Sequence, residues 1–182
     1  MHTAILLSAA DKQGLVPFAG SLRALGWNLL GLRGTAEYLN GEGIPTRDIS
    51  RLSPSMELIQ PGVPRIDLVY ADLFPLGKEV TSRSCTLASV TEKTDVDGII
   101  LLLWATKGRR FVLHSHKQFL EVTQYISDQW RRSPDWNEYK HEKFISALVG
   151  KAIGAVVQHL RVAANYHWDY AEGHDYKAVQ EG

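Results

Sequence analysis

The sequence predicts an α/β fold: a three-layer α/β/α sandwich around a central, mainly parallel sheet of about five strands. Within the first fifty residues, a unit of apolar strand, turn and amphipathic helix occurs nearly twice before a third strand, and this alternation is typical of parallel sheets. The first apolar segment, residues 3–9, has no helical spacing, which suits a strand buried on both faces. Ligands of such sheets bind at the carboxyl ends of the strands, so we expect function at residues 8–12 and 31–35.

The bulk composition narrows the class of protein. A chain of 182 residues is long enough for one domain with a full hydrophobic core. Twenty basic and twenty acidic residues cancel, so no overall field would attract nucleic acid or an acidic membrane. The single cysteine, Cys85, allows no intramolecular disulfide and favours a reducing, cytoplasmic setting. The longest apolar run, residues 99–105, is far shorter than the roughly 20 residues that span a bilayer, so we expect a soluble protein.

Strands and helices follow from local patterns. The residues Leu15, Phe18, Ala19, Leu22 and Leu25 form one helical stripe that Gly26 ends, and Asp11 is placed to cap that helix. Residues 99–105 fit either a strand or a buried helix. The other predicted strands are residues 27–32, 47–49, 66–73 and 111–114, and the other predicted helices are residues 36–41, 117–130 and 138–166. Residues 51–65 are expected to be a connection, and residues 168–182 a polar, loosely packed tail.

Five segments in order carry a resemblance to a known family. They are SAADKQGLVPFAGSLRALG, GLRGTAEYL, GIPTRDIS, IDLVYADLFPLGKEV and DVDGIILLLWATKG. Together they resemble the IMP cyclohydrolase domain of the bifunctional purine-biosynthesis enzyme, which has the methylglyoxal synthase-like fold. The resemblance implies a nucleoside-monophosphate or sugar-phosphate ligand, no metal or organic cofactor, and a homodimer.

The same resemblance implies which residues hold the phosphate. Ser8, Asp11 and Lys12 match the family's turn after the first strand, and Gly34 with Thr35 matches the end of its SGGT turn. Both turns would present backbone amides at the start of a helix, where anions bind. Arg33, which departs from the family's turn, could add a bidentate donor.

The candidate catalytic residues come from two further motifs. Asp95 and Gly98 match the ends of the family's DIGG motif, and Lys107 matches the lysine of its KNH motif. Cyclisation needs an amine to attack a formyl carbon, a developing oxyanion to be stabilised and water to leave. We expect the Asp95 carboxylate to hold and deprotonate the amine, and the Lys107 ammonium to stabilise the oxyanion.

Two departures leave a second function open. The family's basic loop RVKTLHP has no counterpart between the third and fourth strands, and its active-site tyrosine is Phe74 here, without a hydroxyl. A non-catalytic nucleotide-monophosphate or sugar-phosphate binding protein is therefore the alternative to the cyclohydrolase. Methylglyoxal synthase activity is a third possibility, without a matching aspartate signature.

Several candidate residues also have simpler interpretations. Asp95, like Asp11, could be only a helix N-cap, Lys12 a solvated charge, and Lys107 a cation that complements the end of a helix dipole. The spacing of His114 and His116 would suit a metal pair on one face of a strand, but no cysteine or carboxylate cluster accompanies them. We predict no metal site.

Overall fold

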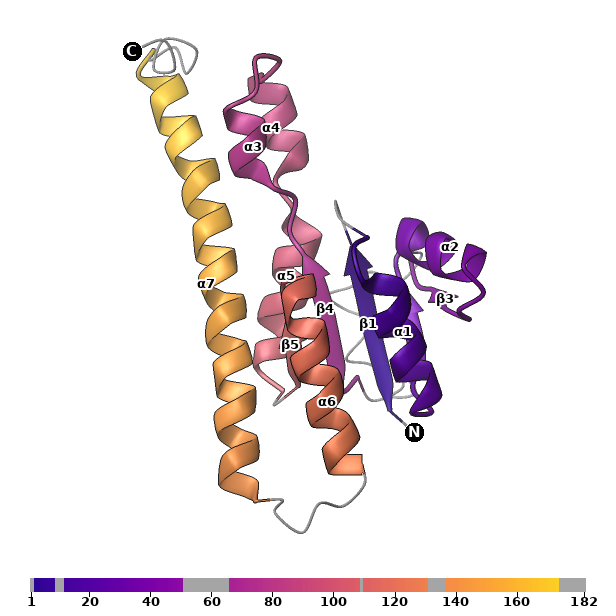
Figure 1. Ribbon diagram of the computed structural model, residues 1–182. Coiled ribbons are helices and arrows are strands. Elements are labelled where there is room, and N and C mark those ends of the chain that lie inside the picture. The colour runs from indigo at the N-terminus through magenta and orange to yellow at the C-terminus, as the bar shows by residue number, and fades with distance from the viewer. Residues whose placement is uncertain (1, 9–11, 51–65, 109, 131–136, 174–182) are drawn as a thin grey trace.

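The computed structural model describes residues 2–8, 12–50, 66–108, 110–130 and 137–173. Its centre is a five-stranded sheet in the order β3-β2-β1-β4-β5, in which every pairing is parallel. The predicted α/β/α sandwich with a central sheet is thus confirmed (Figure 1). The strands are β1 (Thr3–Ser8), β2 (Asn28–Gly31), β3 (Arg47–Asp48), β4 (Leu68–Asp72) and β5 (Phe111–Leu113).

The strand order creates a switch point between β1 and β4. From β1 the chain moves outward in one direction to β2 and β3, and it then returns to the other side of β1 to form β4 and β5. The connections that leave β1 and β4 therefore diverge, and a crevice opens at the carboxyl ends of these two neighbouring strands. In Figure 1 these ends point toward α3 and α4.

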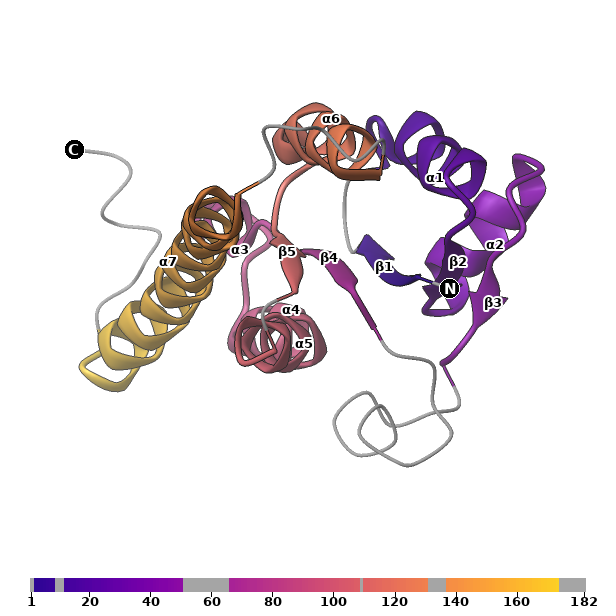
Figure 2. The same cartoon turned by 90° about the horizontal axis from the view of Figure 1, so that it is seen from below.

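Helices cover both faces of the sheet and its β5 edge (Figure 2). Helices α1 and α6 lie over one face, α5 lies over the other, and α7 lies beside β5. Helix α2 lies near β2 and β3. The bounds are α1 Leu15–Ala24, α2 Arg33–Gly41, α3 Leu76–Val80, α4 Leu87–Lys93, α5 Val96–Thr106, α6 Phe119–Trp130 and α7 Glu138–Ala171, with a 3₁₀ turn at His116–Gln118.

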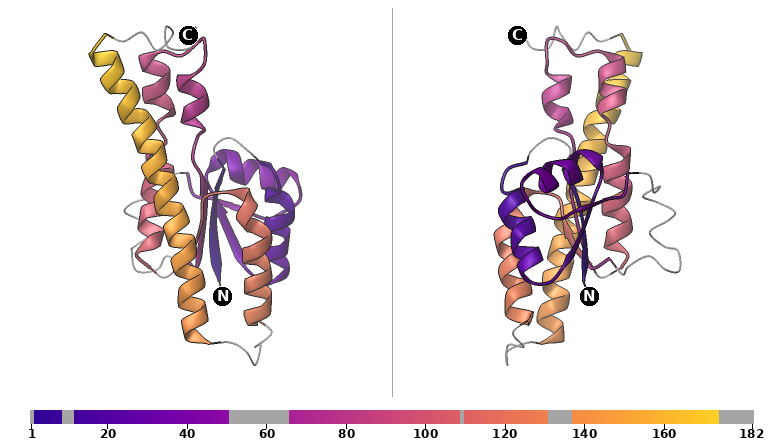
Figure 3. Two further views of the ribbon diagram at one scale, coloured as in Figure 1. Left: turned by 60° about the vertical axis from the view of Figure 1, so that its left-hand side comes forward. Right: turned by 90° about the vertical axis from the view of Figure 1, so that its right-hand side faces the viewer.

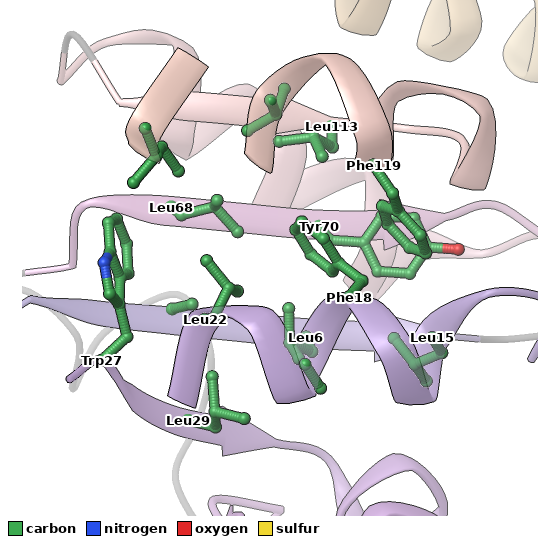
Figure 4. Packing of buried hydrophobic residues seen from close by; sticks show 14 of the residues in the cluster. Leu6, Leu15, Phe18, Leu22, Trp27, Leu29, Leu68, Tyr70, Leu113 and Phe119 are labelled. Carbon is green, nitrogen blue, oxygen red and sulfur yellow. The ribbon is translucent and has the colours of Figure 1, made fainter. Parts of the chain in front are cut away.

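Two hydrophobic cores sandwich the sheet. In β1, Ala4 and Leu6 point into the core under α1 and α6, whereas Ile5 and Leu7 point into the core under α5. This two-sided burial explains why the strand is apolar throughout. In the first core, Phe18 stacks on Phe119 with ring centroids 4.0 Å apart (Figure 4).

Helix α7 extends well past the sheet. With 34 residues it is about 50 Å long, and α3 and α4 stand beside its C-terminal half (Figure 3). A third apolar cluster, which includes Leu76, Val90 and Tyr166, joins these three helices. The described residues thus form a domain of the soluble α/β kind.

Helix α7 also meets the length and hydropathy expected of a membrane-spanning helix, with a mean hydropathy of 1.2 in a window that is 28% buried. This is weak evidence for a membrane span, because core helices of soluble proteins meet the same criterion, and α7 contacts β5, α3 and α5.

Two local predictions are corrected, and one open choice between strand and helix is settled. The N-cap of α1 is Gly14, with φ of +69° and no side-chain hydrogen bond, so the helix begins later than a cap at Asp11 would place it; Asp11 itself lies outside the described residues. The ambiguous run 99–105 is helical because Asp95 caps its start. The expected tail begins later than residue 168, because α7 continues through Ala171. The connection 51–65 and the remainder of the tail, residues 174–182, lie outside the described residues.

Candidate functional site

A cavity of about 550 Å³ lies at the switch point of the sheet. We call it the central cavity; it is lined by Leu7, Leu32, Gly34, Thr35, Phe74 and residues 92–97. Leu7 belongs to β1, while Leu32 and Phe74 follow β2 and β4. The cavity thus occupies the position where open parallel sheets bind ligands, and it brings together four residues that the sequence predicted: Gly34, Thr35, Phe74 and Asp95.

The first feature of the central cavity is the uncapped start of α2. Leu32, the N-cap residue, has an extended backbone and supplies no side-chain hydrogen bond. Its carbonyl accepts from the amides of Thr35 and Ala36 at 2.8 and 2.9 Å. The amides of Arg33 and Gly34, at the first two helical positions, have no acceptor inside the helix. This end of α2 therefore carries partial positive charge and suits an anion.

The second feature is the Asp95 carboxylate at the start of α5. Its Oδ1 accepts from the amide of Gly98 at 2.9 Å, which caps the helix. Its Oδ2 is buried and, within the described part of the chain, has no hydrogen-bond partner. A Cβ added at Gly98 would lie 2.8 to 2.9 Å from this carboxylate, so only glycine leaves the space. Asp95 is thus an N-cap whose second carboxylate oxygen has no hydrogen-bond partner among the described residues.

His159 of α7 fixes the backbone of Asp95. Its Nε2 accepts from the Asp95 amide at 3.3 Å, and the residue is buried, with 6% of its surface exposed. Burial lowers the pKa of His159, against the opposing effects of the Asp95 charge and a hydrogen bond to the Phe74 backbone. A neutral imidazole that accepts at Nε2 carries its proton on Nδ1, a tautomer assigned from this bond. The sequence analysis did not identify His159.

Lys93, at the end of α4, supplies a cation to the central cavity. Its Nζ lies 2.5 Å from Oε2 of the buried Glu79 and 5.4 Å from the centre of the Phe74 ring. Hydrogen bonds from Lys93 and Ser89 hold the pKa of Glu79 below its ordinary value, so Glu79 stays ionised. No sequence pattern pointed to Lys93, because its partner lies 14 residues earlier in a segment without clear periodicity.

Three other predicted phosphate-binding residues lie at the same edge of the sheet but outside the cavity lining: Ser8, Lys12 and Arg33. Ser8 ends β1 and pairs in register with Asp72. The Lys12 ammonium is 5.6 Å from the centre of the Tyr38 ring on α2, and burial lowers its pKa, partly offset by Asp72. Arg33 is the exposed first residue of α2. The side chain of Ser8 lies outside the described part.

The structure does not bring Lys107 to Asp95. Lys107 is the exposed C-cap residue of α5, whereas Asp95 is its N-cap. The two residues are twelve positions apart along the helix, which corresponds to about 18 Å along its axis. Lys107 lies near the start of β5, at the amino edge of the sheet, and the central cavity lies at the carboxyl edge.

Among the described residues, no group of three or more His, Cys, Asp or Glu side chains could hold a metal ion. His114 follows β5 directly, and His116 begins the 3₁₀ turn after it. The two residues therefore do not share a strand face as their spacing had suggested.

Comparison with known proteins supports the fold. No family model matches the sequence. The crystal structure of ForH superimposes with a TM-score of 0.66 at 22% sequence identity, covering 90% of this chain and 99% of that one. At this level of identity the likeness shows a shared fold along nearly the whole length of both chains.

Proposed function

We propose that this protein binds a nucleoside monophosphate in the central cavity and closes formylated aminoimidazole carboxamide ribotide to IMP. One observation carries the proposal: the uncapped start of α2, Lys93 and Asp95, whose buried Oδ2 has no partner among the described residues, line one cavity at the switch point of the sheet. An anion-binding helix end beside a proton acceptor is what a phosphorylated substrate of this reaction requires.

The start of α2 would bind the phosphate. The amides of Arg33 and Gly34 need acceptors, and phosphate oxygens are strong ones. Gly34 has no side chain to block the approach, and a Cβ added there would meet nothing within 4 Å. The charge of Lys93 adds to the field of the helix end, although its ion pair with Glu79 offsets part of that charge.

Asp95 would act on the reacting amine. Oδ2 would accept a hydrogen bond from the carboxamide nitrogen and take its proton as that nitrogen attacks the formyl carbon. A carbon–nitrogen bond forms, and the proton taken from that nitrogen passes to the formyl oxygen, which becomes a hydroxyl group. The formamide nitrogen then gives up its own proton as the carbon–oxygen bond breaks, so that the hydroxyl group leaves as water and a carbon–nitrogen double bond remains in the new ring. Lys93 replaces Lys107 as the proposed cation for the developing oxyanion, because Lys93 shares the cavity with Asp95.

A second candidate is a protein that binds a nucleoside monophosphate or a sugar phosphate without turnover. Phe74 supports it, because this residue lines the central cavity but has no hydroxyl to donate or accept a proton. The absence of the family's basic loop from the sequence supports it as well. The resemblance further leads us to propose that the protein is a cytoplasmic homodimer. Light scattering on the purified protein would test whether it is a dimer.

Two measurements test the proposal. Purified protein is mixed with the formylated ribotide, and IMP formation is followed above the spontaneous rate. Thermal unfolding is then recorded with IMP, AMP and ribose 5-phosphate, because a ligand that binds only the folded state raises the midpoint. Turnover supports the cyclohydrolase, and stabilisation without turnover supports the second candidate. If no phosphate compound shifts the midpoint, both fail.

A further inference from the structure

A second cavity lies beside the central one on the other side of β4. It has a volume of about 320 Å³, and we call it the side cavity. Its walls come from the β4–α3 connection, the end of β5 and α7. Phe74 lines both cavities. His159, which lines the side cavity, accepts a hydrogen bond from Asp95, which lines the central cavity. The two spaces are therefore neighbours along one edge of the sheet.

The strand order sets the span of the two cavities. The start of α2 follows β2, Phe74 follows β4, and His114 follows β5. Three inter-strand spacings separate the ends of β2 and β5, which is about 14 Å at roughly 4.8 Å each. Two neighbouring cavities that span this distance suit an extended ligand whose phosphate and ring system lie at opposite ends.

The side cavity differs from the central cavity in chemistry. Leu73, Phe74, Leu76, Ala155 and Val162 give it mainly apolar walls. An uncompensated charge would be costly to bury there. An uncharged planar ring would instead remove apolar surface from water on both of its faces.

One side chain of the side cavity is available for a polar contact. His114 lines the side cavity, and its backbone amide donates to Gln118. Burial lowers the pKa of His114, nearby Lys151 adds to this effect, and a hydrogen bond with its own backbone opposes it. A neutral imidazole offers one donor and one acceptor, the pair that the edge of a nitrogen heterocycle can use. The other polar groups are engaged: His159 with Asp95, and Gln158 with Arg161.

We propose that the side cavity binds the heterocyclic base of a ligand whose phosphate lies at the start of α2, with His114 contacting the edge of the base. The base enters past Phe74 with its ring on the apolar walls. Its exocyclic groups stay at the boundary between the cavities, beside Asp95. This inference rests on the proposed binding of a phosphorylated ligand, and it adds the place and the chemistry of the base.

Neighbouring positions on α7 provide a matched test. Ala155 lines the side cavity, whereas Gly154 is exposed and a Cβ added there meets nothing within 4 Å. Ala155→Leu therefore fills the cavity, and Gly154→Leu places the same side chain in solvent. Calorimetry on both variants and the unmodified protein compares IMP with ribose 5-phosphate, which lacks the base.

We expect the unmodified protein and Gly154→Leu to bind IMP at least about tenfold more tightly than ribose 5-phosphate, a difference that corresponds to about 1.4 kcal/mol. Ala155→Leu is expected to abolish this preference and to leave the affinity for ribose 5-phosphate unchanged. Equal affinity of the unmodified protein for both ligands, or an intact preference in Ala155→Leu, overturns the inference while the phosphate site stands. If neither ligand binds the unmodified protein, the proposed function fails and the inference with it.

His114→Ala provides a second variant in case Ala155→Leu does not fold. Removing the edge contact should weaken IMP binding by about three- to tenfold, the usual effect of one hydrogen bond, with ribose 5-phosphate unaffected. Unchanged IMP binding in this variant contradicts the assigned contact.

Discussion

The two ends of helix α5 carry the two residues that the sequence matched to one active site, and they differ in every respect that matters for chemistry. At the start, Asp95 lines the central cavity, caps the helix and has a buried carboxylate oxygen without a partner among the described residues. At the other end, Lys107 is exposed at the opposite edge of the sheet. Motifs that match in order along a chain thus need not belong to the same site in the fold.

The helix dipole accounts for both residues at a simpler level. A carboxylate is favourable at the positive start of a helix, and an ammonium is favourable at its negative end. Near the end of α5, Arg110 stacks over Trp104 at 4.0 Å and donates from Nε to the carbonyl of Ile66 at 3.0 Å. Arg110 therefore has a structural role, whereas Asp95 combines a structural role with an oxygen that has no partner among the described residues.

The largest expected effect is on the rate of IMP formation, and it distinguishes Asp95 at the start of α5 from Lys107 at its end. Asp95→Asn keeps an oxygen that can cap Gly98 but removes the negative charge, so IMP formation should fall by about 10²-fold or more, as for the loss of one positioned catalytic group. Lys107→Ala should stay within about twofold of the unmodified rate. Asp95→Ala also removes the cap and should cost about 1 kcal/mol of folding stability. Initial rates and urea unfolding measure these effects. If Lys107→Ala lowers the rate of IMP formation as much as Asp95→Asn does, the proposed difference between the two ends of α5 is wrong.

The sequence predicted the framework well because its signals are local. The two-sided burial of β1 shows as an unbroken apolar run, and Gly26, with φ of +79°, follows α1 as its pattern predicts. Gly34, Thr35, Phe74 and Asp95 were found because each follows a strand or starts a helix within a matching segment. Those positions are fixed by elements that the sequence pattern itself defines.

The rest of the site depends on packing between distant elements. His159 contacts Asp95 across 64 positions, and only the placement of α7 beside α5 makes that contact. In the sequence His159 is one polar residue in a buried stripe with Ala152, Val156 and Ala163, and a stripe with one histidine gives no sign of its partner. Lys93 likewise needs the packing of α3 on α4 to reach Glu79.

The next effect concerns the ion pair at the Asp95 end. Lys93→Met leaves the buried Glu79 carboxylate without its cation, so the thermal midpoint at pH 7 should fall by several degrees, whereas Lys107→Met should barely change it. The folded-state pKa of Glu79 lies below its ordinary value near 4.5. The pair therefore stabilises the protein above that value, and its contribution is lost as the pH falls through the folded pKa. Scanning calorimetry from pH 7 to pH 3 should show that the difference in thermal midpoint between Lys93→Met and the unmodified protein becomes smaller. A constant difference would contradict the stabilising role of the Lys93–Glu79 pair.

The smallest effect concerns the histidine that fixes the Asp95 end. The pKa of His159 is lowered in the folded protein by burial, so the unfolded chain binds its proton at a higher pH. Stability should therefore fall as the pH drops below about 6.5, the ordinary histidine value. His159→Gln can still accept from the Asp95 amide but does not titrate, so its midpoint should decline less between pH 7.5 and pH 5.5. His114, whose pKa is also lowered, will contribute to the remaining decline. The matched control is His167→Gln, at an exposed position of the same helix, which should decline as the unmodified protein does. Equal declines in all three proteins would mean that folding does not lower the pKa of His159, and would contradict its assignment as a buried, neutral acceptor.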